Sequence, residues 1–190
     1  MEDNEELIAQ IAAHYKQILQ LIGEDPERDG LQKTPRRAAK ALLDITRGYK
    51  QDASAIVKSA LFEYSGSKIV VVKDIEFYSL CEHHILPFFG KVSIGYIPDK
   101  TMVGLSKLAR VVEVYARRLQ VQERLTAEIC DSLVNNLSSK GVIVVCRAEH
   151  MCMKMRGVEK QNDSTLTMEY RGVFEDAQLR EEFLKKLQIQ

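Results

Sequence analysis

The sequence has no excess of charge of either sign, because its 190 residues include 27 Lys and Arg and 27 Asp and Glu. A general nucleic-acid binder or a membrane-surface protein needs a broad basic field, so this balance argues against both classes. The sequence also lacks an apolar run long enough to cross a bilayer. The acidic start, Met1–Glu6, lacks the charged-then-apolar pattern of a signal peptide. We therefore expect a cytoplasmic protein whose thiols stay reduced.

Histidine and cysteine are scarce, with four of each, and their placement is uneven. Two short segments, 81–84 and 150–152, hold three of the histidines and two of the cysteines. Cys81 and His84 have a C-x-x-H spacing, which alone is a weak signal, but the clustering in both segments indicates a metal site. Cys81, His84 and Cys152 are three good zinc ligands, and three protein ligands leave the fourth position for water, as in catalytic sites.

The remaining histidines and cysteines of interest have other roles. His83 and His150 sit beside the predicted ligands, where they can transfer protons near the metal. Cys130 lies in a helical pattern and Cys146 in an apolar strand run, so both are most simply small buried hydrophobic residues.

Hydrophobic periodicity predicts an α+β protein with a mostly antiparallel sheet. We expect helices over about 7–22 and 35–48, the second capped by Thr34, and a terminal helix over 177–187. Between them we expect strands from 69 toward 77 and over 91–96, helices over 106–118 and 122–137, and strands over 142–146 and 164–170. We expect residues 1–60 to form a helical extension and residues 61–190 to form the core, within one functional domain.

A second constellation is the basic segment 104–110, Gly-Leu-Ser-Lys-Leu-Ala-Arg. Ser106 is a natural N-cap, and free N–H groups at a helix start bind phosphate readily. Lys107 and Arg110 share one helix face. Taken by itself, this segment is better explained as a capped helix with two solvated cations. Arg156 beyond Cys152, and Arg37 near the start of the second helix, add cations that favour a small polyanionic substrate.

Glu123, at the start of the helix predicted over 122–137, has two interpretations. An acidic residue in a first turn usually complements the helix dipole. At a pocket edge, the same carboxylate accepts paired hydrogen bonds from an amidine-like group such as the N–H edge of guanine. The residue chemistry leaves both open.

Four co-linear motifs together resemble GTP cyclohydrolase I over roughly residues 5–185. They are the segments 81–84 (Cys-Glu-His-His), 104–110, 120–126 (Gln-Val-Gln-Glu-Arg-Leu-Thr) and 149–158 (Glu-His-Met-Cys-Met-Lys-Met-Arg-Gly-Val). Segments 29–31 and 34–37 extend the match toward the N-terminus. Four such motifs in the expected order are highly specific, unlike any one alone.

The resemblance implies the tunnelling fold, a β-β-α-α-β-β antiparallel sheet with helices on one face. It implies zinc ligation by Cys81, His84 and Cys152, with His83 and His150 catalytic. It further implies a substrate-binding set in which Glu123 holds the guanine edge and the others contact the triphosphate, ribose or base: Arg37, Leu105, Ser106, Lys107, Arg110, Gln122 and Arg156.

The implied reaction opens the guanine imidazole ring of GTP by zinc-assisted hydrolysis, the first step of pterin and folate biosynthesis. Water activated by zinc adds to C8 while His150 protonates N7, and formate leaves. The ribose rearranges, with His83 moving protons at its oxygens, to give 7,8-dihydroneopterin triphosphate.

Two other classes stay open from the residues alone. A zinc nucleobase deaminase pairs His-x-Glu with Pro-Cys-x-x-Cys, and this chain has no Pro-Cys-x-x-Cys. A non-catalytic purine- or pterin-binding protein would keep the fold without the chemistry, against which the retained ligands and both histidines argue.

The predicted sheet also bears on assembly. Four strands are too few to close, and their edges present unpaired backbone groups. Closing a barrel from several copies removes those edges. The resemblance implies the same solution, a homo-oligomer of two face-to-face pentamers with active sites between subunits.

Overall fold

The computed structural model of the chain describes residues 2–64, 66, 68–162 and 164–188. Its contacts divide the chain into two compact units, Met1–Arg47 and Gly48–Gln190. The helix α3 (Ala53–Lys58) falls in the second unit. The boundary between an extension over 1–60 and a core over 61–190 stays a prediction.

The first unit is a pair of helices, α1 (Glu2–Leu21) and α2 (Thr34–Ile45). Gly23 follows α1 with a left-handed φ of 88°, as expected of the predicted stop. The predicted cap of α2 is wrong by one residue: Lys33 is the N-cap, and Thr34 is already helical. The Thr34 hydroxyl donates to Gly30 O (3.2 Å) in the preceding turn, so it does not cap the helix.

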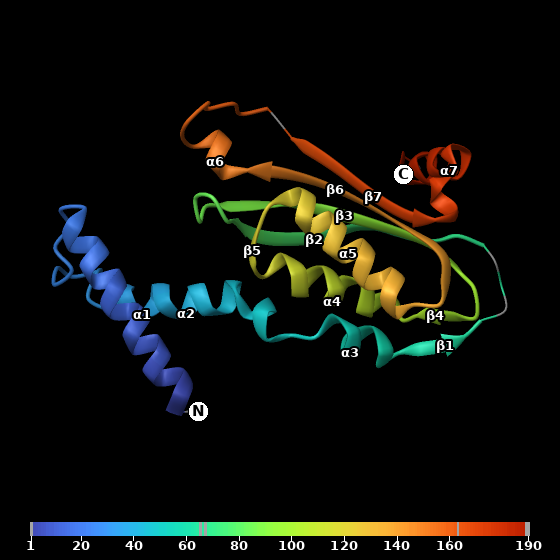
Figure 1. The fold of residues 1–190 in the computed structure, drawn as a ribbon. Coiled ribbons are helices and arrows are strands. Elements are labelled where there is room, and N and C mark those ends of the chain that lie inside the picture. Colours follow the sequence, from blue (N-terminus) through green and yellow to red (C-terminus); the bar gives the residue numbers. More distant parts are fainter. Residues whose placement is uncertain (1, 65, 67, 163, 189–190) are drawn as a thin grey trace. The chain divides into compact units, whose positions relative to one another are not determined.

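The second unit is built on a five-stranded sheet in the order β5-β2-β3-β6-β7 (Figure 1). The strands are β2 (Val70–Cys81), β3 (Pro87–Pro98), β5 (Leu119–Gln120), β6 (Ser139–His150) and β7 (Thr165–Gly172). All neighbouring pairs are antiparallel except the short β5, which runs parallel to β2. A separate ribbon pairs β1 (Leu61–Glu63) with β4 (Thr101–Val103).

One face of the sheet is covered by α4 (Leu105–Ala116) and α5 (Gln122–Asn136), which confirms the predicted β-β-α-α-β-β order (Figure 1). Leu125, Ile129 and Leu133 recur every four residues on α5 and are fully buried. They share one hydrophobic core with strand side chains that include Phe77 and Phe88, whose rings meet edge to face at 5.8 Å. This packing holds the strands, and the residues at the sheet edges, in fixed positions.

The opposite face carries a second, smaller cluster. It joins Ile143 and Val145 of β6 to Phe174 of η2 (Val173–Glu175) and Phe183 of α7 (Ala177–Gln188). A Cβ at Gly95 of β3 would lie 2.6 Å from the Phe183 ring, so glycine gives that ring its room. The C-terminal helix is therefore part of the folded unit.

Three element boundaries differ from the sequence-based expectation in ways that matter for the site. Strand β2 continues to Cys81 and β6 to His150, and a short helix, α6 (Met151–Lys154), follows at once. Helix α4 begins at Leu105 with Gly104 as N-cap, so the predicted cap at Ser106 is wrong. The remaining short helix, η1, spans Arg47–Lys50. Across the described residues, no helix is both long and apolar enough to pass through a membrane.

Candidate metal centre

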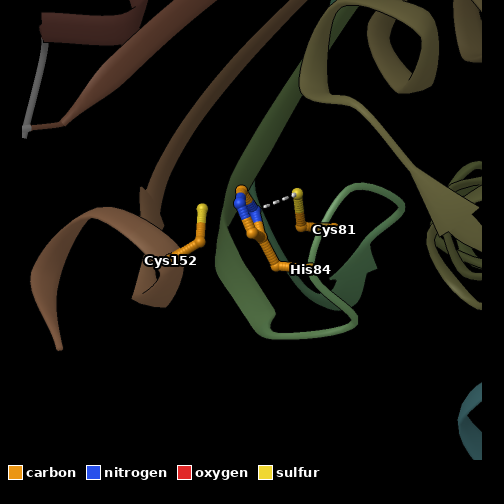
Figure 2. Close-up of side chains that lie close together, drawn as sticks. All are labelled: Cys81, His84 and Cys152. Carbon is orange, nitrogen blue, oxygen red and sulfur yellow. Dashed lines mark hydrogen bonds between the residues drawn. The ribbon is translucent and has the colours of Figure 1, made fainter. Parts of the chain in front are cut away.

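The ends of β2 and β6 bring three potential metal ligands together (Figure 2). One ligand atom from each of Cys81, His84 and Cys152 lies within 4.8 Å of the other two. Cys81 Sγ and His84 Nδ1 are 3.9 Å apart. Two ligands at about 2.1 and 2.3 Å from a tetrahedral zinc ion lie roughly 3.6 Å from each other. The donor set and its spacing therefore fit a metal ion bound by two sulfurs and one imidazole.

The turn between β2 and β3 places His84 against Cys81. Ile85 N–H donates to Cys81 O (2.8 Å), and Cys81 N–H donates to Leu86 O (2.9 Å). Ile85 has a left-handed φ of 54°, a conformation that is rare and costly for a β-branched side chain. Such strain persists where the surrounding structure enforces it, and it is concentrated at functional sites.

The third ligand lies in α6, directly after β6. Burial raises the pKa of the Cys152 thiol, and the neighbouring Cys81 raises it further, while Arg156 acts in the opposite direction. A bound metal cation reverses this balance, because it stabilises thiolates. Arg156 itself is exposed just beyond α6.

His150 is the last residue of β6, and its ring is held on two sides. It stacks in parallel on Phe88 of β3, with 4.8 Å between the ring centroids. Its Nε2 lies 2.8 Å from Gln122 Oε1. Gln122 Nε2 donates to Cys146 O (3.1 Å) and Thr165 O (3.0 Å), which assigns the amide orientation. The Gln122 oxygen is therefore the acceptor, and His150 Nε2 carries the hydrogen.

The other predicted catalytic histidine, His83, is in the turn beside the ligands. Its side chain is 65% exposed, and its Nε2 lies 3.9 Å from Glu82 Oε1. The rings of His83 and His84 are nearly perpendicular, with centroids 6.2 Å apart. His83 therefore borders the metal cluster without adding a ligand to it.

The predicted substrate-binding residues fall into separate places. Glu123 is exposed in the first turn of α5, at the sheet edge that carries the cluster. Gln122 is only 1% exposed, and its side chain hydrogen-bonds to Cys146 O, Thr165 O, Thr167 Oγ1 and His150. Arg37 is exposed on α2, in the first unit.

The residues predicted at the start of α4 lie away from the cluster within one chain. Leu119, just after α4, pairs with Leu80 beside Cys81, so the C-terminal end of α4 faces the metal edge. The 12 residues of α4 span about 18 Å. Leu105, Ser106 and Lys107 stand at the far end of that span, and Arg110 lies along it. Within a single copy, Leu105, Ser106 and Lys107 therefore lie about one helix length from the end of α4 that faces the cluster.

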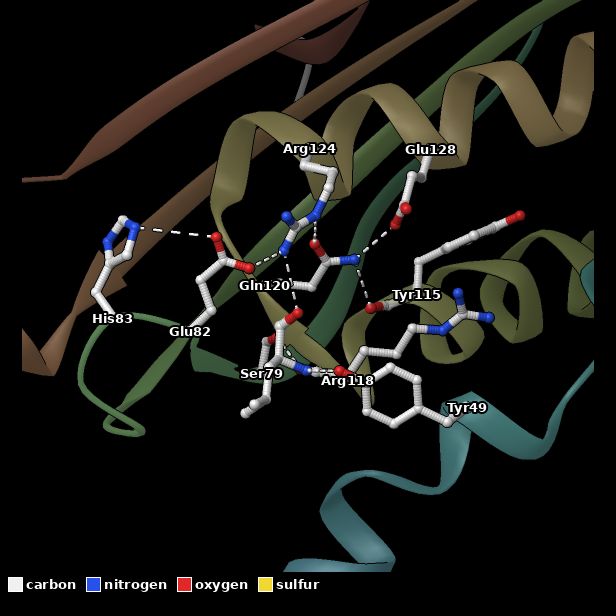
Figure 3. A network of polar contacts seen from close by, with 10 residues as sticks. Tyr49, Ser79, Glu82, His83, Tyr115, Arg118, Gln120, Arg124 and Glu128 are labelled. Carbon is white, nitrogen blue, oxygen red and sulfur yellow. Dashed lines mark hydrogen bonds and ion pairs between the residues drawn. The ribbon is translucent and has the colours of Figure 1, made fainter.

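A polar network beside the cluster was not predicted from the sequence (Figure 3). It links Glu82 to Arg124, and Arg124 to the buried Gln120. Two of these residues stand in the 120–126 motif, but nothing in their spacing revealed contacts with residue 82. Arg124 lowers the pKa of the Glu82 carboxyl, mainly through its hydrogen bond, which keeps that group ionised.

The fold and the side-chain cluster define an α+β protein with a candidate metal centre at one edge of its sheet. The family model described as GTP cyclohydrolase I matches residues 11–188. Curated relatives named GTP cyclohydrolase 1 include that of Porphyromonas gingivalis, which is 56% identical over 96% of this chain and 94% of its own length. The human protein is 53% identical over 96% of this chain and 74% of its own length. The chain belongs to the GTP cyclohydrolase I family.

Among solved structures, the archaeosine synthase QueF-Like in its apo form is similar to this chain with a TM-score of 0.46. The two are 18% identical, over 57% of this chain and 97% of that one.

Proposed function

We propose that this protein is a zinc-dependent GTP cyclohydrolase I that converts GTP to 7,8-dihydroneopterin triphosphate with release of formate. The observation that carries this proposal is the cluster of Cys81, His84 and Cys152 with His83 and His150 at its border. Three ligands suit a catalytic metal, and two adjacent imidazoles suit a reaction with several proton transfers. Family membership supports the same activity.

Cys81, His84 and Cys152 would hold the metal. Two thiolates and one imidazole at near-tetrahedral spacing favour zinc over harder cations. When bound, zinc supplies Lewis acidity that activates water near neutral pH. A zinc–thiolate site also requires reduced cysteines, which agrees with the predicted cytoplasmic location.

The two histidines transfer protons in the proposed reaction, and Glu123 binds the guanine. His150, whose Nε2–H is held by Gln122, takes up a second proton at Nδ1 and gives that proton to N7 of guanine as the imidazole ring opens. Its contacts with Phe88 and Gln122 fix its ring for that task. His83, exposed beside the cluster, transfers protons at the ribose oxygens. Glu123 accepts two hydrogen bonds from the guanine edge, which discriminates guanine from bases without those donors.

The triphosphate set requires more than one copy of the chain. Ser106, Lys107 and Arg110 belong to a helix whose start lies about 18 Å from the metal edge. A second copy that brings its own α4 start to this edge would join them to Arg156, with Leu105 beside the base or ribose. We assign Arg37 to the same anion-binding set. This separation supports a homo-oligomer, and its form as two pentamers rests on the family resemblance alone. It also predicts that GTP is turned over far better than GMP.

Measuring formate and ammonia from GTP tests the proposal. The purified protein should release formate and form a fluorescent pterin, should stop after treatment with a chelator, and should recover when zinc is restored. Release of ammonia in place of formate would instead identify a nucleobase deaminase. Binding of GTP with neither product would identify a non-catalytic purine-binding protein.

A further inference from the structure

Arg124 on α5 reaches three acceptors around the turn that carries His83 (Figure 3). Its Nη2 pairs with Glu82 Oε2 and also donates to Leu119 O (3.2 Å). Its Nε donates to Gln120 Oε1 (3.0 Å). One planar guanidinium therefore ties the β2–β3 turn to β5 and to α5.

Gln120 fixes the orientation of that guanidinium. Its side chain is 1% exposed, and its Nε2 donates to Glu128 Oε2 (2.7 Å) and Tyr115 O (3.1 Å). Because its amide hydrogens are used by these two acceptors, its oxygen points at Arg124. A buried, fully bonded amide holds a position better than an exposed one, since moving it would leave polar groups unpaired.

The strand β5 that carries Gln120 is itself anchored, although it is only two residues long. It pairs with the end of β2, where Cys81 lies opposite Gln120. On its other side, Leu119 N–H donates to the Tyr49 hydroxyl (3.1 Å). Gln120, which accepts a hydrogen bond from Arg124, is therefore held in place by the contacts of β5 on both sides.

Contacts with β5 and with Arg124 restrain both the backbone and the side chain of Glu82. Its N–H donates to Gln120 O (2.9 Å), and one carboxylate oxygen pairs with Arg124. The other oxygen, Oε1, lies 3.9 Å from His83 Nε2. The chain of contacts thus runs from the buried Gln120 through Arg124 and Glu82 to the exposed His83.

We propose that Arg124 is a positioning residue that acts through Glu82 to hold His83 in its working orientation. The proposal rests on the proposed function. An exposed histidine explores several rotamers, and misplacing a reacting group by about 1 Å costs on the order of a hundredfold in rate. Lysine does not replace arginine here, because an ammonium lacks the fork that donates to Gln120 and Glu82 together.

A double-mutant cycle tests this chain of contacts. Arg124→Lys and Glu82→Gln are compared singly and together, with formate and pterin measured separately from GTP. Arg117→Lys is the matched control, because Arg117, the C-cap of α4, also pairs with a glutamate, Glu113 (3.0 Å). Zinc content and thermal unfolding are recorded for every variant.

We expect Arg124→Lys to lower the kcat for pterin about 10- to 100-fold, with KM within about twofold of the parent value. Formate release should fall less than pterin formation, because His83 acts after ring opening. Glu82→Gln should show the same pattern, and the double variant should be no slower than the slower single one. Zinc content should stay at the parent level.

Three results would overturn the proposal: turnover of both single variants equal to that of Arg117→Lys, multiplied effects in the double variant, or loss of zinc from Arg124→Lys. If Arg124→Lys fails to fold, the Glu82→Gln comparison with the control still decides the matter. Failure of the parent protein to make formate or pterin would refute the proposed function, and not the positioning role alone.

Discussion

Gln122 shows how one buried side chain prepares a reactive one. Its contact with substrate stays a prediction. In the structure Gln122 is 1% exposed, and its amide is bonded to Cys146 O, Thr165 O and His150. Its role in the structure is to select the His150 tautomer that carries hydrogen on Nε2. Removing the amide would delete its hydrogen bonds to Cys146 O and Thr165 O, at about 0.5–1.5 kcal/mol each.

We expect Gln122→Met to lose ring opening and stability together. Nitrogen-15 NMR of the imidazole should show one Nε2–H tautomer for His150 in the parent and a mixture in the variant. Gln10→Met, which changes an exposed glutamine on α1, should leave the spectrum and the activity unchanged. A single unchanged tautomer in Gln122→Met would remove this role from Gln122.

The four cysteines should fall into two pairs that differ in their reactivity toward a thiol reagent. Cys81 and Cys152 belong to the metal cluster, whereas Cys130 and Cys146 are fully buried. We expect a thiol reagent to titrate about two cysteines after chelation of the folded protein, and all four in denaturant. A third thiol that reacts in the folded, chelated protein would contradict this assignment.

The same buried thiols predict how stability depends on alkaline pH. Burial raises the pKa of Cys130 and of Cys146 to about 12, against about 8.5 in an unfolded chain. Below about pH 8.5 both states hold the protons, so the stabilisation is complete; above it the unfolded state alone releases them. Stability should therefore fall by up to about 1.4 kcal/mol per pH unit per thiol until pH 12. Denaturant titrations at pH 8 and pH 10 measure how much unfolding free energy the parent and Cys146→Ala each lose between these pH values. An equal loss in the two proteins would contradict the prediction.

At the scale of elements, the pairing of β3 with β6 aligns the two halves of the site. Phe88 lies opposite His150. Two residues further along β3, Gly90 lies opposite Ala148. A Cβ at Gly90 would stand 2.0 Å from Arg147 O, which no side-chain movement relieves. The register that delivers Cys152 to Cys81 therefore depends on a glycine at this position.

We expect Gly90→Ala to destabilise the fold by about 1–3 kcal/mol and to weaken zinc retention, since overpacking must push β6 away from β3. Gly104→Ala is the matched control for stability, because its Cβ would meet neighbours at ordinary contact distances of 3.6 Å or more. Urea unfolding and zinc analysis check both variants. Equal stability of Gly90→Ala and Gly104→Ala would contradict the proposed close approach of the strands.

The elements also show what the sequence can and cannot predict. The order of strands and helices follows from periodicity, and α5 begins and ends within a residue of its predicted range. The ends of β2 and β6 were missed, because Ser79 and Arg147 interrupt the apolar pattern that defines a strand. The three ligands were predictable because Cys and His are scarce. The roles of Gln120, Gln122 and Arg124 were not, because common polar residues acquire them only through contacts between segments distant in the chain.

At the scale of the whole molecule, the distance between the α4 start and the metal edge leads us to expect that the site depends on assembly. We expect light scattering to show a large homo-oligomer and not an active 21.6 kDa monomer. Co-assembly gives a sharper result: Cys81→Ser and Lys107→Ala, each nearly inactive alone, should regain activity when mixed in one oligomer. Mixed oligomers as inactive as their parents would place the whole site in one chain.

The central claim is that this protein opens the guanine ring of GTP at the Cys81, His84 and Cys152 cluster. The most direct measurement is a carbon-13 NMR time course with GTP labelled at C8, using the zinc-loaded protein and Cys81→Ser as control. The label should leave the nucleotide and appear as formate at the rate of pterin formation, and it should remain in GTP with the variant. A label that stays in the purine while GTP is consumed, or formate release by Cys81→Ser at the parent rate, would contradict the account.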